Sequence, residues 1–509
     1  MRKYPFLLSL LLLARSLASA PNWGPCPPNQ ITAGSFMQDC ANITYPLDYN
    51  NVALGTVNAF VRRAYVTTPT TNSIWLISGG PGDSNLSLSP FCQFFLASNS
   101  DYTCYTQDAR GTGLSSYMSC GDNQPYGPFD PYNSTIVAMY TSCVNQITAQ
   151  YGNVLQYYST YNAQMDLLNT IIAVNPALVH IYAQSYGSYA VNTYMQLPGA
   201  RYDAIVIDGP VPPNRWPFEN NAEWASQVAQ DVAFSCVTNS SVCRDRMSEM
   251  AHIPKLVMDS IIDGTLPCIQ NLTWLQDENE AQYWTSFYAN GVTAGGDLQT
   301  AHTAFCPFWY RLHRCSATDI EQLNFFNAYQ RMNNGPASRP NPIYYSYGLG
   351  TSIGVSELYS YSKNPLSYDH QVLRSSRMFA SGAVEIMMSY VRNETDLPLY
   401  SVNSSVYKKF AKPTAPVLIL VGTLDANTEN GLGYWFQEGL GSKASLLNVP
   451  YNSHVTVCQF CACANSLVLQ WFNSLGTSID SSCLADMQPP DWDGSSQAVQ
   501  SSSYTLFGT

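Results

Sequence analysis

Short apolar runs, each ending in a turn of small or polar residues, recur along the chain. Runs of this kind predict buried strands of a parallel sheet, because such strands are covered on both faces. Apolar residues at helical spacing over 161–175 predict the helix that leads into the strand beginning at Leu178, and alternation over 59–66 indicates an antiparallel start to the sheet. The sequence therefore predicts an α/β fold with a mostly parallel central sheet flanked by helices. The parallel strands are expected at 73–78, 102–107, 178–182, 204–209, 415–422 and 445–449.

The composition changes after Pro210. Aromatic and amide-rich stretches continue to about 405, and 219–234 has the pattern of a helix. A long insertion before the last core strands is where folds of this class place a lid, and lids set access and specificity. We therefore expect a large, mainly helical cap inserted before the last core strands. The expected units are a signal peptide (1–20), the first part of the core (21–210), the cap (211–405), the second part of the core (406–490) and a Ser-rich tail (491–509).

The first twenty residues predict a secretory signal peptide. Arg2 and Lys3 precede the apolar run 6–13, and small residues follow, so that cleavage after Ala18 or Ala20 is equally consistent. No later stretch reaches the ~18 uninterrupted apolar residues of a membrane span, so we expect a secreted, extracellular protein without a membrane anchor. Seven N-x-S/T sites are compatible with glycosylation on this route: Asn42, Asn85, Asn133, Asn239, Asn271, Asn393 and Asn403.

All fifteen cysteines follow the signal stretch. Together with the signal they predict an oxidising compartment and several disulfides, with one cysteine left over. One bridge is expected between Cys26 and Cys40. No spacing combines C-x-x-C pairs with histidines, so we expect no metal and no cofactor, even at the cluster of Cys458, Cys461 and Cys463.

The chain is acidic. Its net charge is −12, and loss of Arg2, Lys3 and Arg15 with the signal brings the charge to −15. This charge argues against nucleic acid and anionic membrane surfaces as partners, because both repel an acidic protein. The oligomeric state is left open.

Ser185 lies within a predicted strand, turn and helix. The small residues Ala183 and Gly187 flank it, and the stretch 188–195 suits a helix. A serine in so tight a turn has strained backbone angles at the carboxyl edge of the sheet, with its hydroxyl exposed above a helix N-terminus. This pattern indicates a nucleophile elbow, usually G-x-S-x-G, in which Ala183 replaces the first glycine. Taken alone, it also fits an ordinary capping serine.

The predicted strand at 73–78 runs directly into the sequence GGPG. Pro81 has no N–H to donate, so an amide aimed at a developing oxyanion must come from a glycine of this loop, and Gly80 is the first choice. The amide of Tyr186, next to the nucleophile, is expected to supply the second hydrogen bond. A plain Gly-Pro turn explains the same residues equally well.

A further loop, DARGTGLS at 108–115, follows the strand predicted at 102–107. Asp108 and Arg110 are two positions apart, and we expect them to pair across the glycine turn and hold the loop beside the active site. The role expected for this motif is structural rather than chemical.

Together these stretches resemble the serine aminopeptidases of the proline-iminopeptidase and tripeptidyl-aminopeptidase group, which have the α/β-hydrolase fold. The family's H-G-G-P-G loop, D-x-R-G-x-G-x-S motif and G-x-S-Y-G elbow correspond, in the same order, to 78–82, 108–115 and 183–187. Ser78 replaces the histidine of the first motif and Ala183 the first glycine of the last, and neither change removes a catalytic group. The resemblance extends from about residue 35 and is weak across the middle of the chain. It implies peptide substrates and an exopeptidase that releases residues or short peptides from free N-termini.

The resemblance also implies the acid and the base of a catalytic triad. In the family, a G-x-x-D-x-x-T pattern after a core strand carries the acid, and Gly422, Asp425 and Thr428 reproduce it. All other histidines precede Asp425, so the order Ser, Asp, His of α/β-hydrolases leaves His454 as the base. The expected triad is Ser185, Asp425 and His454. The alternatives are a helix-capping aspartate and a solvated loop histidine.

Recognition of a substrate amine requires a carboxylate, because a buried ammonium needs an anionic partner. The family holds the amine with acidic cap groups, and Glu357, in the stretch TSIGVSELYS, resembles such a position. Glu219 and Glu223 are rivals, and a solvated surface charge is the alternative for each.

The resemblance also bears on the cysteines. The family tends to carry a cysteine pair near Cys236 and Cys243, and it carries one cysteine after the catalytic histidine and another near the C-terminus. We therefore expect Cys461 or Cys463 to bond to Cys483.

Two other functions stay open at this point. A lipase or carboxylesterase uses the same triad and the same fold, which does not choose between esters and peptides. A non-catalytic secreted binding protein on this fold is the third possibility, and an intact Ser185, Asp425 and His454 weighs against it.

Overall fold

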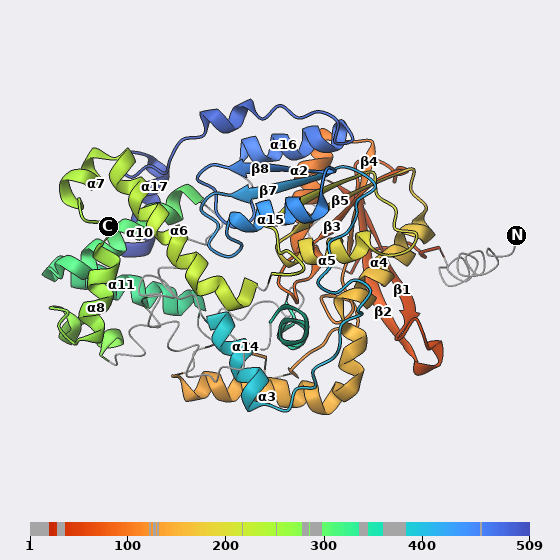
Figure 1. Ribbon diagram of the computed structural model, residues 1–509, viewed down its shortest axis with the longest axis horizontal. Helices are drawn as coiled ribbons and strands as arrows, with labels where there is room; N and C mark the ends of the chain where they lie inside the picture. Colours follow the sequence, from red (N-terminus) through yellow and green to blue (C-terminus); the bar gives the residue numbers. More distant parts are fainter. Residues whose placement is uncertain are drawn as a thin grey trace, which may run out of the picture.

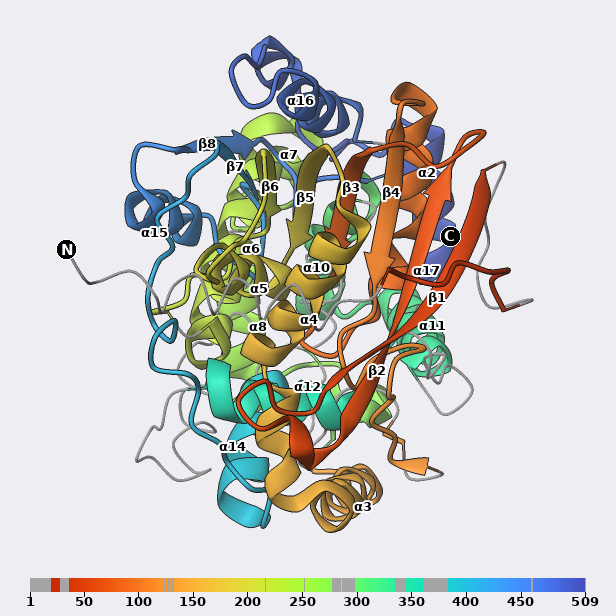
Figure 2. The same ribbon diagram turned by 90° about the vertical axis from the view of Figure 1, so that its right-hand side faces the viewer.

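Eight strands form a single sheet in this computed structural model, in the order β1-β2-β4-β3-β5-β6-β7-β8 (Figure 2). Strand β2 is antiparallel to both β1 and β4, and all other neighbouring strands are parallel. The mostly parallel sheet with an antiparallel start is therefore confirmed. The strands are β1 Met37–Pro46, β2 Thr56–Tyr65, β3 Asn72–Ile77, β4 Tyr102–Gln107, β5 Leu178–Gln184, β6 Ala204–Asp208, β7 Val417–Gly422 and β8 Ala444–Val449.

The structure describes most of the 509 residues. The predicted signal peptide lies outside the described part except for Ala20. None of the described helices is long and apolar enough to cross a membrane. The described residues are 20–27, 36–121, 124–125, 129, 132–215, 217–250, 252–276, 285, 298–334, 345–359, 383–458 and 461–508.

Helices cover both faces of the sheet, because successive strand residues point to opposite sides. In β3, Ile74 and Leu76 belong to the apolar layer under α2 and α16, whereas Trp75 and Ile77 belong to the layer under α4, α5 and α15 (Figure 1). The apolar runs seen in the sequence thus fill two layers at once. The core helices are α2 Ser89–Ser98, α3 Ser134–Tyr151, α4 Thr160–Val174, α5 Tyr186–Met195, α15 Gly431–Leu440 and α16 Ala462–Asn473. Short 3-10 helices are η1 Val52–Leu54, η2 Asn85–Leu88, η4 Gly152–Tyr158 and η9 Ser482–Asp486.

The segment between β6 and β7 is helical in its described part and has an apolar cluster of its own, centred on residues such as Val232, Phe308 and Trp309. Leu424 and Ala426, from the loop after β7, join this cluster and so connect it to the sheet edge. The helices are α6 Pro217–Asn239, α7 Ser241–Arg246, α8 Ile253–Ile262, η5 Ile269–Asn271, η6 Thr273–Leu275, α10 Leu298–Arg314, α11 Ala317–Asn334, α12 Tyr347–Ile353, η8 Gly354–Leu358 and α14 Ala383–Glu394.

The Ser-rich tail packs against these inserted helices. Its helix α17 (Gln497–Phe507) lies beside α10 and α11 (Figure 1). The Phe507 ring stacks on Phe326 with 5.3 Å between ring centroids, and the Arg311 guanidinium lies 4.3 Å from the centroid of the Phe507 ring. Strands β1 to β6 fall within 21–210 and β7 and β8 within 406–490. We propose that the chain divides into a core (21–210 and 406–490), a cap (211–405) and a tail (491–509).

Seven disulfides staple the chain, and the remaining cysteine, Cys306, is buried with a free thiol. The two bridges expected from the sequence, Cys26–Cys40 and the bridge to Cys483, are confirmed, and Cys463 is the partner of Cys483. Cys236 and Cys243 also form a bridge. So many bridges are typical of proteins that fold in an oxidising compartment. The pairs are Cys26–Cys40, Cys92–Cys104, Cys120–Cys143, Cys236–Cys243, Cys268–Cys315, Cys458–Cys461 and Cys463–Cys483.

The seven glycosylation sequons differ in exposure. Six of the asparagines lie at the surface, whereas Asn85 is only partly exposed and its side-chain oxygen accepts a hydrogen bond from Ser78 N at 2.7 Å. Because the amide of Asn85 also donates to the carbonyl of Gln107, a glycan there would break the network. The exposed candidates are therefore Asn42, Asn133, Asn239, Asn271, Asn393 and Asn403.

Candidate active site

Ser185 occupies the turn between β5 and α5 with backbone angles that few residues adopt. Its φ is 53° and its ψ is −128°, in a region where L-residues are strained. Ser185 N donates to the Asp208 carbonyl at 2.8 Å, which ties the turn to the end of β6. A Cβ on Gly187 would lie 2.6 Å from the Ile77 carbonyl oxygen, so this close approach requires glycine. The turn has the geometry of a nucleophile elbow.

Asp425 and His454 face each other on the loops after β7 and β8. His454 Nδ1 lies 2.9 Å from Asp425 Oδ2 and 3.1 Å from Oδ1. The buried carboxylate also accepts hydrogen bonds from Asn427 N (2.8 Å), Thr428 N (2.7 Å) and Thr428 Oγ1 (2.6 Å). These donors orient the carboxylate toward the imidazole ring. Because Nδ1 faces Asp425, the other ring nitrogen, Nε2, is the one available to a reacting group.

The pKa of His454 is raised above its ordinary value. Burial lowers this pKa, but the negative charge of Asp425 and the hydrogen bond to it outweigh burial, and the charges of Asp208 and Asp83 add to the effect. Carboxylates on several elements thus stabilise the imidazolium that forms when His454 accepts a proton. The arrangement suits a general base.

The end of β6 joins the serine turn to the histidine loop. The backbone carbonyl of Asp208 accepts a hydrogen bond from the N–H of Ser185. Its buried carboxylate accepts hydrogen bonds from the N–H of Thr456 (2.8 Å) and from the next N–H along the chain (3.0 Å). At Gly209, where φ is 68°, a Cβ would lie 3.0 Å from His454 Cε1. These two residues place the His454 ring beside the strand end that holds Ser185. Within the described residues, Ser185 and His454 form no hydrogen bond with each other.

Gly209→Ala should displace the His454 ring, because ring atoms already contact the position of the added methyl group. We expect kcat/KM to fall about 100-fold, the order of loss that follows a misplacement of about 1 Å in an active site. Gly199→Ala is the matched control, since Gly199 also has a positive φ (85°) but nothing lies within 4 Å of an added Cβ. Both variants are assayed on a chromogenic ester. Equal losses would assign the effect to backbone strain and not to His454.

The glycine loop after β3 lies directly against the nucleophile. A Cβ on Gly79 would be 2.8 Å from Ser185 Cβ and 3.2 Å from Ser185 Oγ. Gly80 has a φ of 102°, and a Cβ there would lie 2.7 Å from Gly82 N. Both positions therefore require glycine. The amides predicted to hold an oxyanion, those of Gly80 and Tyr186, come from this loop and from the residue that follows Ser185.

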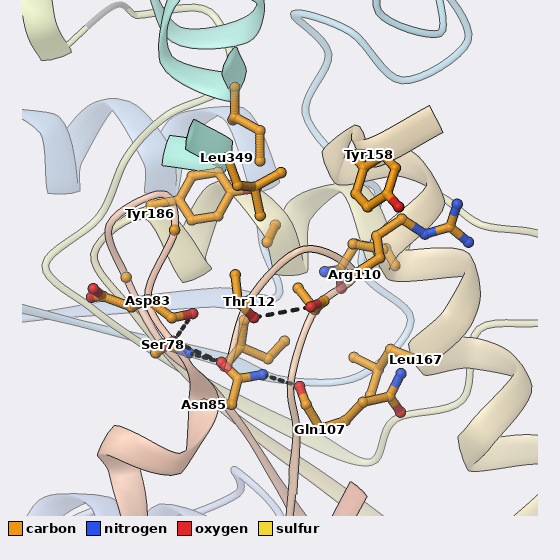
Figure 3. A pocket seen from close by; sticks show the side chains of 18 residues that line it. Ser78, Asp83, Asn85, Gln107, Arg110, Thr112, Tyr158, Leu167, Tyr186 and Leu349 are labelled. Atoms are coloured by element: carbon orange, nitrogen blue, oxygen red, sulfur yellow. Dashed lines mark hydrogen bonds between the residues drawn. The ribbon is translucent and has the colours of Figure 1, made fainter. Parts of the chain in front are cut away.

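Polar side chains behind the glycine loop hold it in place (Figure 3). Ser78 N and Ser78 Oγ each lie 2.7 Å from Asn85 Oδ1, and the Asn85 amide reaches the carbonyl of Gln107. These groups border a cavity of ≈ 40 Å³ between the loop and α4. Neither Ser185 nor His454 borders this cavity, so it belongs to the support of the loop and not to a substrate site. Ser78 is therefore part of that support.

The prediction that Asp108 pairs with Arg110 is wrong. Asp108 is buried and accepts a hydrogen bond from Leu114 N at 2.8 Å, because the turn closes around its carboxylate. Arg110 points the other way and makes two hydrogen bonds with Asp166 of α4, at 2.8 Å and 2.6 Å (Figure 3 shows the Arg110 side chain). The structural role expected for both residues stands, with different partners.

Glu357 lies in η8, fully buried beside Tyr186. Its Oε1 accepts hydrogen bonds from Thr160 N (2.9 Å) and Tyr400 OH (2.7 Å), and the Thr160 hydroxyl lies 2.6 Å from the Tyr186 hydroxyl. Burial raises the pKa of Glu357. The carboxylate thus sits next to the side chain that follows the nucleophile. The side chains of its rivals lie outside the described part of the structure: Glu219 and Glu223.

The sequence matches no family model and no curated protein. Similar solved structures include a proline iminopeptidase from Mycobacterium smegmatis, with 12% identity and a TM-score of 0.40 over 86% of this chain and 99% of that one. Others are a serine hydrolase from Cycloclasticus zankles (10% identity, TM-score 0.36, 86% and 100% covered) and an esterase from Exiguobacterium antarcticum (10% identity, TM-score 0.31, 83% and 96% covered).

The strand order, the strained serine after β5, and an acid and a histidine after β7 and β8 together decide the fold. It is the α/β-hydrolase fold. In this α/β-hydrolase fold the expected chain order of Ser185, Asp425 and His454 is met, and their elements end at one edge of the sheet.

Three residues of the site were not found from the sequence. Asp208 and Gly209 are the last residues of the predicted strand AIVIDG. Their position at the carboxyl end of a parallel strand, where α/β folds bind ligands, could have identified them as site residues. Asp83 followed the glycine loop, and only the structure shows that its charge acts on His454.

Proposed function

We propose that this protein is a secreted serine hydrolase that releases residues or short peptides from free N-termini. The observation that carries the proposal is the strained Ser185, whose N–H bonds to the carbonyl of Asp208. The next residue, Gly209, lies against the ring of His454, which bonds to Asp425. The resemblance of 78–82, 108–115 and 183–187 to serine aminopeptidases favours an exopeptidase over other hydrolases. Seven disulfides support a secretory route.

The proposed reaction is acyl transfer. His454 takes the proton of the Ser185 hydroxyl while Ser185 Oγ bonds to the scissile carbonyl carbon, and Asp425 stabilises the imidazolium. His454 then gives its proton to the leaving amine as the C–N bond breaks, leaving an acyl-enzyme. Water, deprotonated by His454, attacks the acyl carbon and releases the acid together with Ser185.

The negative charge of the tetrahedral intermediate falls on the carbonyl oxygen. In the proposal the amides of Gly80 and Tyr186 donate to this oxyanion, each contributing about 3 kcal/mol, as in comparable sites. The closeness of Gly79 to Ser185 Oγ supports a placement of the loop amides at the reacting carbon.

The test of the function compares three kinds of substrate. Secreted protein is incubated with peptides that have free N-termini, with the same peptides acetylated, and with a small neutral ester, and product masses are measured. The proposal expects products from free N-termini and none from acetylated peptides. Ester cleavage without peptide cleavage would instead identify a carboxylesterase, and no cleavage of any substrate would favour a binding protein.

Glu357→Gln should weaken turnover of free-amine peptides and spare a small neutral ester. In the proposal Glu357 binds the substrate ammonium. Hydrogen bonds to charged groups contribute about 1.5–3 kcal/mol, so we expect kcat/KM to fall roughly 10- to 100-fold for the peptide alone. Glu438→Gln, at an exposed position of α15, is the charge-matched control. An equal loss on both substrates, or no loss on either, would show that the amine is held elsewhere.

A further inference from the structure

Asp83 places a carboxylate next to the glycine loop. A Cβ on Gly80 would lie 3.5 Å from Asp83 Cγ, and a Cβ on the preceding Gly79 would lie 3.2 Å from Ser185 Oγ. The Asp83 carboxylate, three positions along the chain from Gly80, therefore folds back beside the residue whose amide is predicted to hold the oxyanion.

Contacts on both sides fix the position of Asp83. Its carbonyl accepts a hydrogen bond from Ser78 Oγ at 3.2 Å, and Ser346 N donates to the Gly82 carbonyl at 2.9 Å, next to the bridge between Asp83 and Tyr345. Asp83 borders the small cavity, and Figure 3 shows its carboxylate pointing away from Gln107 and Arg110. The residue stays partly exposed, so a substrate group can reach it.

The groups that face this carboxylate are titratable, and none is a permanent cation. They are His454, on the loop after β8, Tyr345, which precedes α12, and Tyr347, in α12. Burial raises the pKa of Asp83 to about 6, although the charge of His454 opposes this effect. Both tyrosines have a raised pKa and stay neutral below pH 8, and among the described residues no Lys or Arg forms an ion pair with Asp83.

The Asp83 carboxylate has two opposite effects during attack. It favours the imidazolium of His454, and it repels the negative charge that develops on the carbonyl oxygen in a poorly solvated site. The repulsion is relieved when the substrate brings a positive charge of its own to the carboxylate. A carboxylate without a Lys or Arg ion-pair partner among the described residues is thus placed to select substrates by charge.

We propose that Asp83 binds the α-ammonium of the residue whose carbonyl Ser185 attacks, so that the enzyme releases single N-terminal residues. The inference rests on the proposed exopeptidase function and names the length of its product. An ammonium group has three N–H donors, so a second carboxylate such as Glu357 is compatible with it.

The length of the product follows from the reach of the chain. The α-ammonium of the residue under attack is bonded to the carbon next to the scissile carbonyl, within range of a carboxylate beside Gly80. The ammonium of a tripeptidyl substrate lies two residues further away, roughly 7 Å at the length of an extended chain. In this proposal a carboxylate beside Gly80 therefore binds the ammonium of the single residue and not that of the longer substrate.

The test compares wild type with Asp83→Asn on four substrates: leucine p-nitroanilide, N-acetyl-leucine p-nitroanilide, alanyl-alanyl-leucine p-nitroanilide and p-nitrophenyl acetate. Wild type should prefer the first, and Asp83→Asn should lower kcat/KM for it about 30-fold, since a charged hydrogen bond is lost. Turnover of p-nitrophenyl acetate should change much less, since the ester loses only the small effect of the Asp83 charge on His454. Asp263→Asn, at an exposed position of the cap, is the charge-matched control.

A pH profile of the wild-type protein gives a second measurement that needs no variant. The ratio of kcat/KM for leucine p-nitroanilide to that for p-nitrophenyl acetate removes the ionisation of His454, which both reactions share. Asp83 must be ionised to bind the ammonium, so this ratio should fall about tenfold per unit as the pH drops below about 6. It should fall again above about 8, where the substrate amine loses its proton.

The outcomes separate this inference from the proposed function. Cleavage of the tripeptidyl substrate in preference to leucine p-nitroanilide, or a variant that loses equal activity on the amine and on the ester, would overturn the role of Asp83 and leave the exopeptidase standing. A wild-type protein that hydrolyses only the ester would overturn both. Labelling of Asp83→Asn by a serine-directed phosphonate at the wild-type rate shows that the variant is folded.

Discussion

Ser185→Ala should abolish hydrolysis of peptides and esters alike while the protein stays folded. We expect kcat to fall by about 10⁶, the order seen when the nucleophile of a serine triad is removed. The reason is that Ser185 supplies the hydroxyl that His454 activates in the proposed triad. The change deletes one oxygen atom from a partly exposed side chain, and the backbone bond from Ser185 N to the Asp208 carbonyl remains. Steady-state kinetics and thermal unfolding measure the two effects.

A phosphonate directed at active-site serines identifies the nucleophile in the same set of proteins. It should label Ser185 alone, and His454→Ala should prevent labelling, because the hydroxyl then has no base. Ser466→Ala, at an exposed position of α16, is the matched control and should label as wild type does. Turnover that survives in Ser185→Ala, or labelling of a different serine, would refute the triad.

Asp425→Asn is expected to lower kcat by about 10⁴, although the site keeps its shape. The asparagine keeps one carbonyl oxygen but loses the charge that faces His454 Nδ1 at 2.9 Å, so neither the required tautomer nor the imidazolium is stabilised. Its amide nitrogen also brings N–H donors toward groups that donate at present, the amides of Asn427 and Thr428. Single-turnover kinetics on an ester measures the loss.

The pH dependence of the remaining activity gives a second expectation for Asp425→Asn. His454 acts as a base when it is neutral, so activity is lost as the pH falls through its pKa. Asp425 raises that pKa, and its removal should therefore move the acid limb of the residual activity to lower pH. Asp480→Asn, at the surface, is the control and should leave the limb in place. A loss of less than tenfold with an unmoved limb would exclude Asp425 as the acid.

Local patterns in the sequence determined the strands and the turns of the site. Six parallel strands could be read from the sequence. Five of them, β3 to β7, are buried, and a strand covered on both faces favours apolar residues at successive positions, whereas β8 at the sheet edge buries only Val449. The elbow at Ser185 could be read from its small neighbours, since the close approach of α5 to Ile77 leaves no room for a side chain at Gly187. The bridge between Cys26 and Cys40 joins neighbouring segments and was equally visible. Contacts of these kinds depend on residues close in the chain.

Pairings between distant residues were decided by the tertiary structure. Arg110 was expected to bond to Asp108, but docking of α4 brings Asp166 to it from 56 positions away, and the glycine turn encloses the Asp108 carboxylate. Asp208 reaches the amide of Thr456 across 248 positions. Side-chain direction and the docking of helices select such partners, and neither has a signature in the local order of residues. The sequence by itself therefore determined which groups carry the chemistry, whereas only the folded chain decided which carboxylates surround them.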